Sequence, residues 1–104
     1  MKKKYKMVPP VSYALRKLGD DIRDARKRRN ITMALLAERA GINVITLAKI
    51  EKGNANASMG GYASVLYSLG MIDRLQDIAD ASHDLIGQML ANERLPQRVR
   101  VSKK

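Results

Sequence analysis

Side chains that can transfer protons or bind metals come together at Asp80, His83 and Asp84. His83 is the only histidine and the chain has no cysteine, so it offers neither a two-histidine metal site nor a thiolate nucleophile. The two aspartates are expected to cap helices or face solvent, and no phosphate-binding glycine loop is present. A second carboxylate group lies among arginines at the spacing of helix-surface pairs: Asp20, Asp21 and Asp24. The sequence therefore predicts no enzymatic activity, no metal and no cofactor.

Binding through charge is the chemistry that the composition favours, because 20 basic residues face 10 acidic ones for a net charge of +10. Residues 1–29 carry +8, residues 30–92 carry −2 and residues 93–104 carry +4. Two cationic ends suit a polyanionic partner, nucleic acid before membrane, although solvated basic ends on a helical protein are the simpler alternative. The apolar runs are too short to span a membrane, and the lack of cysteine suits a cytoplasmic, nucleoid-associated protein.

Helical periodicity and capping residues divide the first 70 residues into four expected helices. Ser12 is expected to cap the first helix, in which Gly19 costs about 1 kcal/mol relative to Ala and suggests close packing. Thr32 and Asn43 are expected to cap the second and third helices, which Gly41 and Gly53 end. Ser58 is expected to cap a fourth that buries Val65, Leu66 and Leu69.

The C-terminal third is expected to hold helical pieces near residues 72–79 and 82–92, followed by a tail. Pro96 is expected to exclude helix, so the tail is predicted to be extended or a short strand. The fold class is all-α, with five or six short helices around one core. We predict three parts: a basic N-terminal arm over 1–11, a helical domain over 12–79, and a C-terminal helix and basic tail over 80–104.

Residues 32–53 carry the spacing of a helix-turn-helix. Two helices joined by a short turn approach closely only where a side chain is small, and Ala37 meets that need. Gly41 follows four residues later where the turn needs a positive φ, and Leu47 follows six residues after Gly41 to face the first helix. Ile42 before the third helix and Leu47 within it have hydrophobic-staple spacing. An ordinary helical hairpin is the alternative, and this combination of positions disfavours it.

Residues 15–70 resemble the Cro/C1-type (XRE-family) helix-turn-helix domain. The resemblance is carried by "LGDDIRDARKRRNIT", "LLAERAGI", "TLAKIEKG" and "YASVLYSLGM". It implies a lambda-repressor-like domain of five helices, acting as a homodimer that binds double-stranded operator DNA with an inverted repeat. It also implies that Val44, Ile45 and Lys49 stand where relatives commonly touch base edges.

The expected DNA contacts follow from this resemblance and from the residue types. Base contacts are expected from the start and outer face of the third helix: Asn43, Val44, Ile45, Thr46 and Lys49. Val and Ile depart from the polar residues common there, and they can contact thymine methyl groups or pack against another protein. Phosphate contacts are expected from basic side chains and from backbone N–H groups at the second helix start: Lys27, Arg28, Arg29, Thr32, Met33, Arg39 and Lys52.

The C-terminal stretch "ADASHDLIGQMLANERLPQRVR", residues 79–100, is similar to the end segment of HipB-like antitoxins. That resemblance implies a transcriptional repressor that controls its own operon together with a HipA-type kinase toxin. Four residues are expected to face the toxin or the dimer mate, or otherwise to complete the core: Leu85, Ile86, Met89 and Leu90. Val99 and Val101 are expected to add a strand across the dimer or to a partner, with a disordered tail as the alternative. Two alternatives stay open: a phage or mobile-element regulator without a toxin, and a protein-interaction adaptor that has lost DNA binding.

Overall fold

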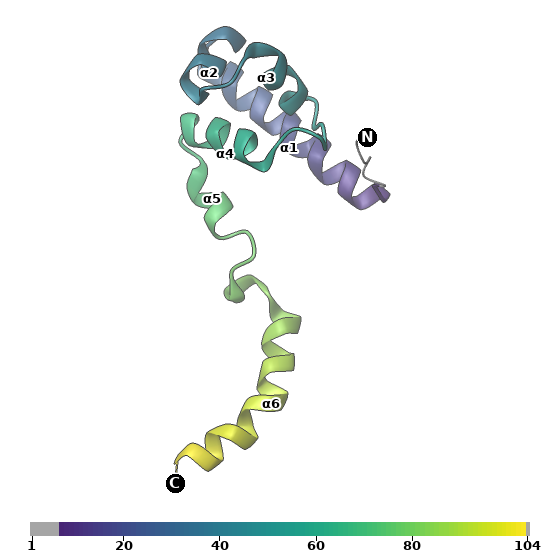
Figure 1. Cartoon of the computed structure of the whole chain (residues 1–104), viewed down its shortest axis with the longest axis vertical. Coiled ribbons are helices and arrows are strands. Elements are labelled where there is room, and N and C mark those ends of the chain that lie inside the picture. The colour runs from purple at the N-terminus through teal and green to yellow at the C-terminus, as the bar shows by residue number, and fades with distance from the viewer. Residues whose placement is uncertain (1–6, 104) are drawn as a thin grey trace. The chain divides into compact units, whose positions relative to one another are not determined.

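The protein is all-helical, as the sequence predicts, in a computed structural model that describes the backbone of residues 7–103 and the side chains of residues 7–94. The helices are α1 (Pro9–Arg28), α2 (Met33–Ala40), α3 (Val44–Glu51), α4 (Met59–Ser68), α5 (Ile72–Gln76), the 3-10 helix η1 (Ala81–His83) and α6 (Leu85–Lys103) (Figure 1). The chain divides into two compact units, Met1–Ile72 and Asp73–Lys104. The predicted domain borders at residues 11 and 79 stay predictions.

The first helix begins earlier than predicted, at Pro9 rather than after a Ser12 cap. Its N-cap is Val8, which makes no side-chain cap hydrogen bond. Pro9 and Pro10 explain the difference, because proline is pre-set for the first helical turn, where its missing N–H would have no partner anyway. The backbone N–H of Ser12 instead donates to the carbonyl of Val8 at 3.2 Å, inside the first turn.

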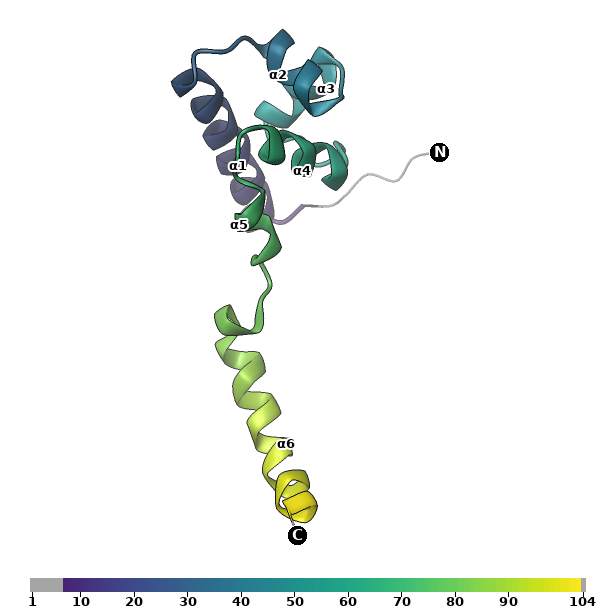
Figure 2. The ribbon, with the colours of Figure 1, turned by 90° about the vertical axis from the view of Figure 1, so that its left-hand side faces the viewer.

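The core of the first unit lies between α1 and the three helices that follow it, all on one side of α1 (Figure 2). Ser58 caps α4, as predicted, by accepting a hydrogen bond from the N–H of Gly61 at 2.9 Å. The hydroxyl of Tyr62 ties α4 to the preceding loop by donating to the carbonyl of Asn54 at 2.8 Å. The buried apolar side chains are Ile22, Ala25, Leu36, Ala37, Leu47, Ile50, Tyr62, Val65, Leu66 and Leu69.

Two glycines allow α1 to meet the C-terminal end of α3 backbone against backbone. A Cβ at Gly19 would lie 2.7 Å from the carbonyl oxygens of Ile50 and Glu51 and from the nitrogen of Gly53. A Cβ at Gly53 would lie 2.4 Å from the carbonyl oxygen of Leu15, and its φ of +74° is itself a conformation that favours glycine. The close packing expected at Gly19 is thus confirmed, and its partner is the end of α3.

A buried ion pair joins the same two helices about two turns further along α1. The Nε of Arg26 donates to Oε2 of Glu51 at 2.7 Å and its Nη2 donates to Oε1 at 3.1 Å. Its Nη1 donates to the carbonyl of Ile31 at 3.2 Å, which extends the contact to the loop before α2. The hydrogen bond to Glu51 raises the pKa of the Arg26 guanidinium, so the cation persists. Both residues are under a tenth exposed, which makes the pair sensitive to loss of either member.

The second unit is built differently, because none of its described residues is buried. α6 runs to Lys103, so the prediction that the chain becomes extended after Pro96 is wrong. A proline inside a helix costs about 3 kcal/mol, but a helix can continue past it with a bend. Its neighbours Leu95, Gln97 and Arg98 are strong helix formers. Val99 and Val101 alternate with arginines over too few residues to favour a strand over the helix that these neighbours favour.

Replacement of Gly19 by Ala tests the backbone contact between α1 and α3. The new methyl group meets three backbone atoms that cannot move separately, so we expect a loss of stability of about 1–3 kcal/mol or more. The measurement is thermal and urea unfolding followed by circular dichroism. Gly60→Ala is the matched control, because a Cβ at Gly60 meets only Ser58 Oγ at 3.8 Å, and it should be neutral or slightly stabilising. Equal effects of both changes would contradict the close approach.

Replacement of Glu51 by Ala tests the buried ion pair. It leaves the Arg26 cation without its carboxylate in a buried place, and we expect a loss of about 3–5 kcal/mol in the free energy of unfolding. Asp21→Ala is the control, because it breaks the pair between Lys17 Nζ and Asp21 Oδ2, which is just as short at 2.7 Å but exposed. The control should leave the melting temperature unchanged within error. A small effect of Glu51→Ala would show that the ion pair does not hold α3.

Candidate nucleic-acid interface

The turn between α2 and α3 has the geometry that the spacing of its residues predicts. Thr32 caps α2 by accepting from the N–H of Leu35 at 3.1 Å, and Asn43 caps α3 by accepting from the N–H of Thr46 at 2.8 Å. Gly41 has a φ of +73°, and the N–H of Ile42 then donates to the carbonyl of Ala37 at 3.0 Å. This pattern closes the end of α2 and turns the chain into α3 within three residues.

The outward face of α3 is exposed and mainly apolar. Val44 is 43% exposed and Ile45 is 66% exposed, so neither is buried within its own chain. Lys49 is also exposed and Thr46 is half-buried. Asn43 is exposed, but its Oδ1 is used in capping α3, which leaves its amide N–H₂ free to donate. Four of the five residues predicted to contact bases, Asn43 to Thr46, thus form the start of α3, and Lys49 lies one turn beyond Ile45.

The residues predicted to contact phosphates do not all have free side chains. Lys27, Arg28, Thr32, Arg39 and Lys52 are exposed, and Met33 is half-buried at the start of α2. Arg29 instead binds its own protein, because Nη1 donates to the carbonyl of Ala25 at 2.9 Å and Nη2 to that of Leu69 at 3.0 Å. This geometry favours a structural role for Arg29, joining the ends of α1 and α4.

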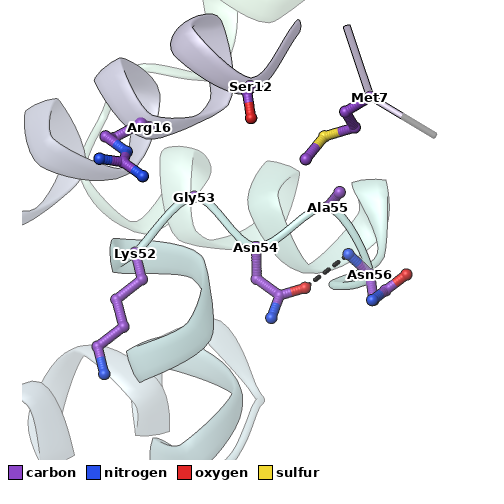
Figure 3. Close-up of a pocket in the computed structure, with 8 residues that line it drawn as sticks. All are labelled: Met7, Ser12, Arg16, Lys52, Gly53, Asn54, Ala55 and Asn56. Atoms are coloured by element: carbon purple, nitrogen blue, oxygen red, sulfur yellow. Dashed lines mark hydrogen bonds between the residues drawn. The ribbon is translucent and has the colours of Figure 1, made fainter. Parts of the chain in front are cut away.

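Two basic residues that the sequence analysis did not select lie beside Lys52. Arg16 and Lys52 line an open hollow of about 320 Å³ with Asn54 and Asn56 of the following loop (Figure 3). Asn54 shapes this loop, since its Oδ1 accepts from the N–H of Asn56 at 2.6 Å.

Arg23 and Lys27 line a second hollow of about 280 Å³, which also includes Lys52 and Met33. Arg16, Arg23 and Lys27 share the helical spacing i, i+7 and i+11, which places them along one side of α1, with Asp20 between them. This spacing could have identified Arg16 and Arg23 from the sequence as neighbours of Lys27. We call Arg16, Arg23, Lys27 and Lys52 the basic rim of α3.

The two aspartates that flank His83, Asp80 and Asp84, act as local caps. Asp80 accepts from the hydroxyl of Ser82 at 2.6 Å and from its N–H at 3.0 Å, and these hydrogen bonds lower the pKa of Asp80. Asp84 accepts from the N–H of Gly87 at 3.0 Å at the start of α6. The capping role expected for both is confirmed. Within the described residues no cluster of three His, Cys, Asp or Glu side chains is arranged to hold a metal.

The residues expected to face a toxin or a dimer mate are exposed where the structure describes them. Leu85 and Ile86 are 70% and 71% exposed, and Met89 and Leu90 are 55% and 54% exposed. Within the described part of their own unit they pack into no core, and the alternative expectation that they complete one stays a prediction. The side chains of Val99 and Val101 lie outside the described part. No helix in the part of the chain that was searched combines the length and apolar character needed to cross a membrane.

Comparison with known proteins finds one family. Residues 22–60 match the model of the family HTH_3, described as helix-turn-helix. No curated protein matches the chain, and no solved structure does. The matched residues span the last third of α1, the whole α2–α3 pair and the start of α4. Residues 22–60 are therefore similar to a helix-turn-helix family, which supports a DNA-binding regulator of transcription.

Proposed function

We propose that the chain is a dimeric, sequence-specific repressor that inserts α3 into the major groove of operator DNA. The observation that carries this proposal is the exposed N-terminal end of α3, with lysines and arginines on one side of it and its C-terminal end held against α1. A short helix whose first turn is free and whose far end is fixed can enter a groove without moving the rest of the domain.

The two kinds of DNA contact are divided between two sets of residues. Val44, Ile45, Thr46 and Lys49 face base edges, together with the amide nitrogen of Asn43. The basic rim faces the phosphates next to the groove, and Arg28 and Arg39 extend the cationic surface. Backbone N–H groups after Thr32 add contacts at the start of α2. Phosphate contacts supply affinity that depends on salt, whereas contacts to base edges supply the sequence preference.

We infer that the second unit serves to join two copies of the chain through α6. Leu85, Ile86, Met89 and Leu90 form an apolar stripe over two turns, and the described side chains of their own unit leave it exposed. Aspartates precede this stripe at Asp80 and Asp84, and basic residues follow it from Arg94 onward. In an antiparallel pair of α6 helices, the acidic end of one copy would lie near the basic end of the other. A two-fold dimer would then present two α3 helices to half-sites about 34 Å apart.

Repression of its own operon beside a HipA-type kinase toxin is the finer form of the proposal. Its support is the similarity of residues 79–100 to the end segment of HipB-like antitoxins. Co-expression with the adjacent reading frame tests it: a kinase-like product should copurify with the chain and bind the operator together with it. An adjacent integrase, or a kinase that stays separate, would favour the phage or mobile-element alternative.

The test of DNA binding begins by selecting bound duplexes from a random pool and measuring affinity by fluorescence anisotropy at several salt concentrations. Lys49→Ala should weaken binding to the selected duplex by about 1–3 kcal/mol and binding to scrambled duplex little, because its contact is to a base. Arg23→Ala should weaken both alike and reduce the slope of log K against log salt by about one.

Lys17→Ala is the control for Arg23→Ala. It removes the same charge from the same helix, at a position already paired with Asp21, and should leave the salt slope unchanged. Equal affinity of the unaltered protein for selected and scrambled duplexes would refute sequence-specific binding.

The dimer is tested by Ile86→Glu. A charge in the middle of the apolar stripe should raise the dissociation constant of the dimer by at least about tenfold, since an unpaired buried charge is strongly disfavoured. Sedimentation velocity measures it. Ala91→Glu is the matched control, because residue 91 is exposed on the opposite side of the same helix, and that variant should stay dimeric. A wild-type chain that sediments as a monomer at concentrations that bind DNA would contradict the dimer.

A further inference from the structure

The first turn of α3 has little capacity to read bases by hydrogen bonds. Val44 and Ile45 have no polar side-chain atom, and both are exposed. The Oδ1 of Asn43, which could accept from a base, already accepts from the N–H of Thr46. Thr46 is half-buried, and Glu51 is bound to Arg26. Along α3 the exposed side chain with a full charge is Lys49, one turn further on than Ile45.

The major groove offers one apolar group to such a surface, the C5-methyl group of thymine. Cytosine and uracil have hydrogen at that position, and 5-methylcytosine carries the same methyl group in the same place. The charges near Val44 and Ile45 favour a DNA duplex as their partner rather than an apolar protein surface. A polyanion would neutralise the nearby cations, which are Lys49, Lys52, Arg23 and Lys27. The apolar pair therefore lies where DNA would approach.

We propose that Val44 and Ile45 recognise C5-methyl groups of pyrimidines, so that the chain distinguishes thymine from uracil and 5-methylcytosine from cytosine. This inference rests on the proposed DNA binding and specifies what its recognition helix reads. It implies that cytosine methylation facing α3 strengthens binding, which would make occupancy of a site sensitive to the methylation of the DNA. The aliphatic pair is then the determinant of specificity, with Lys49 adding a polar contact beside it.

The experiment uses the full-length chain and duplexes selected from a random pool. Each thymine of the selected sequence is replaced in turn by deoxyuridine, and affinity is measured by anisotropy. At positions that face α3 we expect roughly a fourfold loss per methyl group, since burial of one such group contributes about 0.8 kcal/mol. Where a C·G pair is placed there instead, conversion of its cytosine to 5-methylcytosine should recover about the same factor.

Variants assign the effect to named residues. Val44→Ala and Ile45→Ala should bind the thymine duplex more weakly and bring the thymine-to-uracil affinity ratio toward one. Both side chains are exposed, so the fold should persist, and circular dichroism checks it. Lys49→Ala is the control: it should weaken binding to both duplexes and leave the ratio unchanged. A ratio that stays the same in both aliphatic variants would overturn the assignment to Val44 and Ile45.

The outcomes separate this inference from the proposed function. A selected consensus that binds equally with thymine and uracil at every position overturns methyl recognition and leaves sequence-specific binding intact. A pool that yields no consensus overturns both. A consensus with uracil-sensitive positions, and with sensitivity removed by Val44→Ala or Ile45→Ala, is the expected result.

Discussion

The close approach of α1 to the end of α3 is the constraint on which the interface depends. Gly19 and Gly53 let the two backbones meet without Cβ atoms between them, so even one methyl group at either position would separate the helices. The bidentate contact of Arg26 with Glu51 fixes the same junction about two turns further along α1. A backbone contact sets the distance between the helices, and the ion pair sets the rotation of α3 about its axis. Together they determine which side chains of α3 face outward.

Because α3 is held by its C-terminal end, Val44 and Ile45 in its first turn stay exposed. Leu47 and Ile50 fill the core, and Glu51 is used in the ion pair, whereas Val44 and Ile45 add nothing to the core. Residues that pack in the core and residues that we propose to contact DNA are therefore different residues of one eight-residue helix. This separation permits an apolar pair at the recognition end, since exposed Val and Ile there do not weaken the fold that presents them.

Local signals explain most of what could be predicted from the sequence. Thr32, Asn43 and Ser58 cap helices because each satisfies N–H groups only three residues away. The Arg26–Glu51 pair was missed because its members are 25 residues apart and a charged residue is normally assigned to the surface. Arg26 lies four residues after the buried Ile22, and Glu51 lies four residues after the buried Leu47. This helical spacing could have indicated from the sequence that both charged residues face the core. The tail after Pro96 was mispredicted because one proline was given more weight than the helix-forming residues around it.

Charge context distinguishes the two exposed apolar surfaces of the chain. The pair on α3 is accompanied by cations of the basic rim, so its partner must tolerate positive charge and present small apolar groups, as the major groove of DNA does. The stripe on α6 lies between Asp84 and Arg94, with acidic residues before it and basic residues after it. A surface with opposite charges at its two ends is complementary to its own inverted copy, whereas one with charges of a single sign repels it. The charge argument that supports the proposal of DNA as the partner of α3 thus also supports the proposal of a second copy of the chain as the partner of α6.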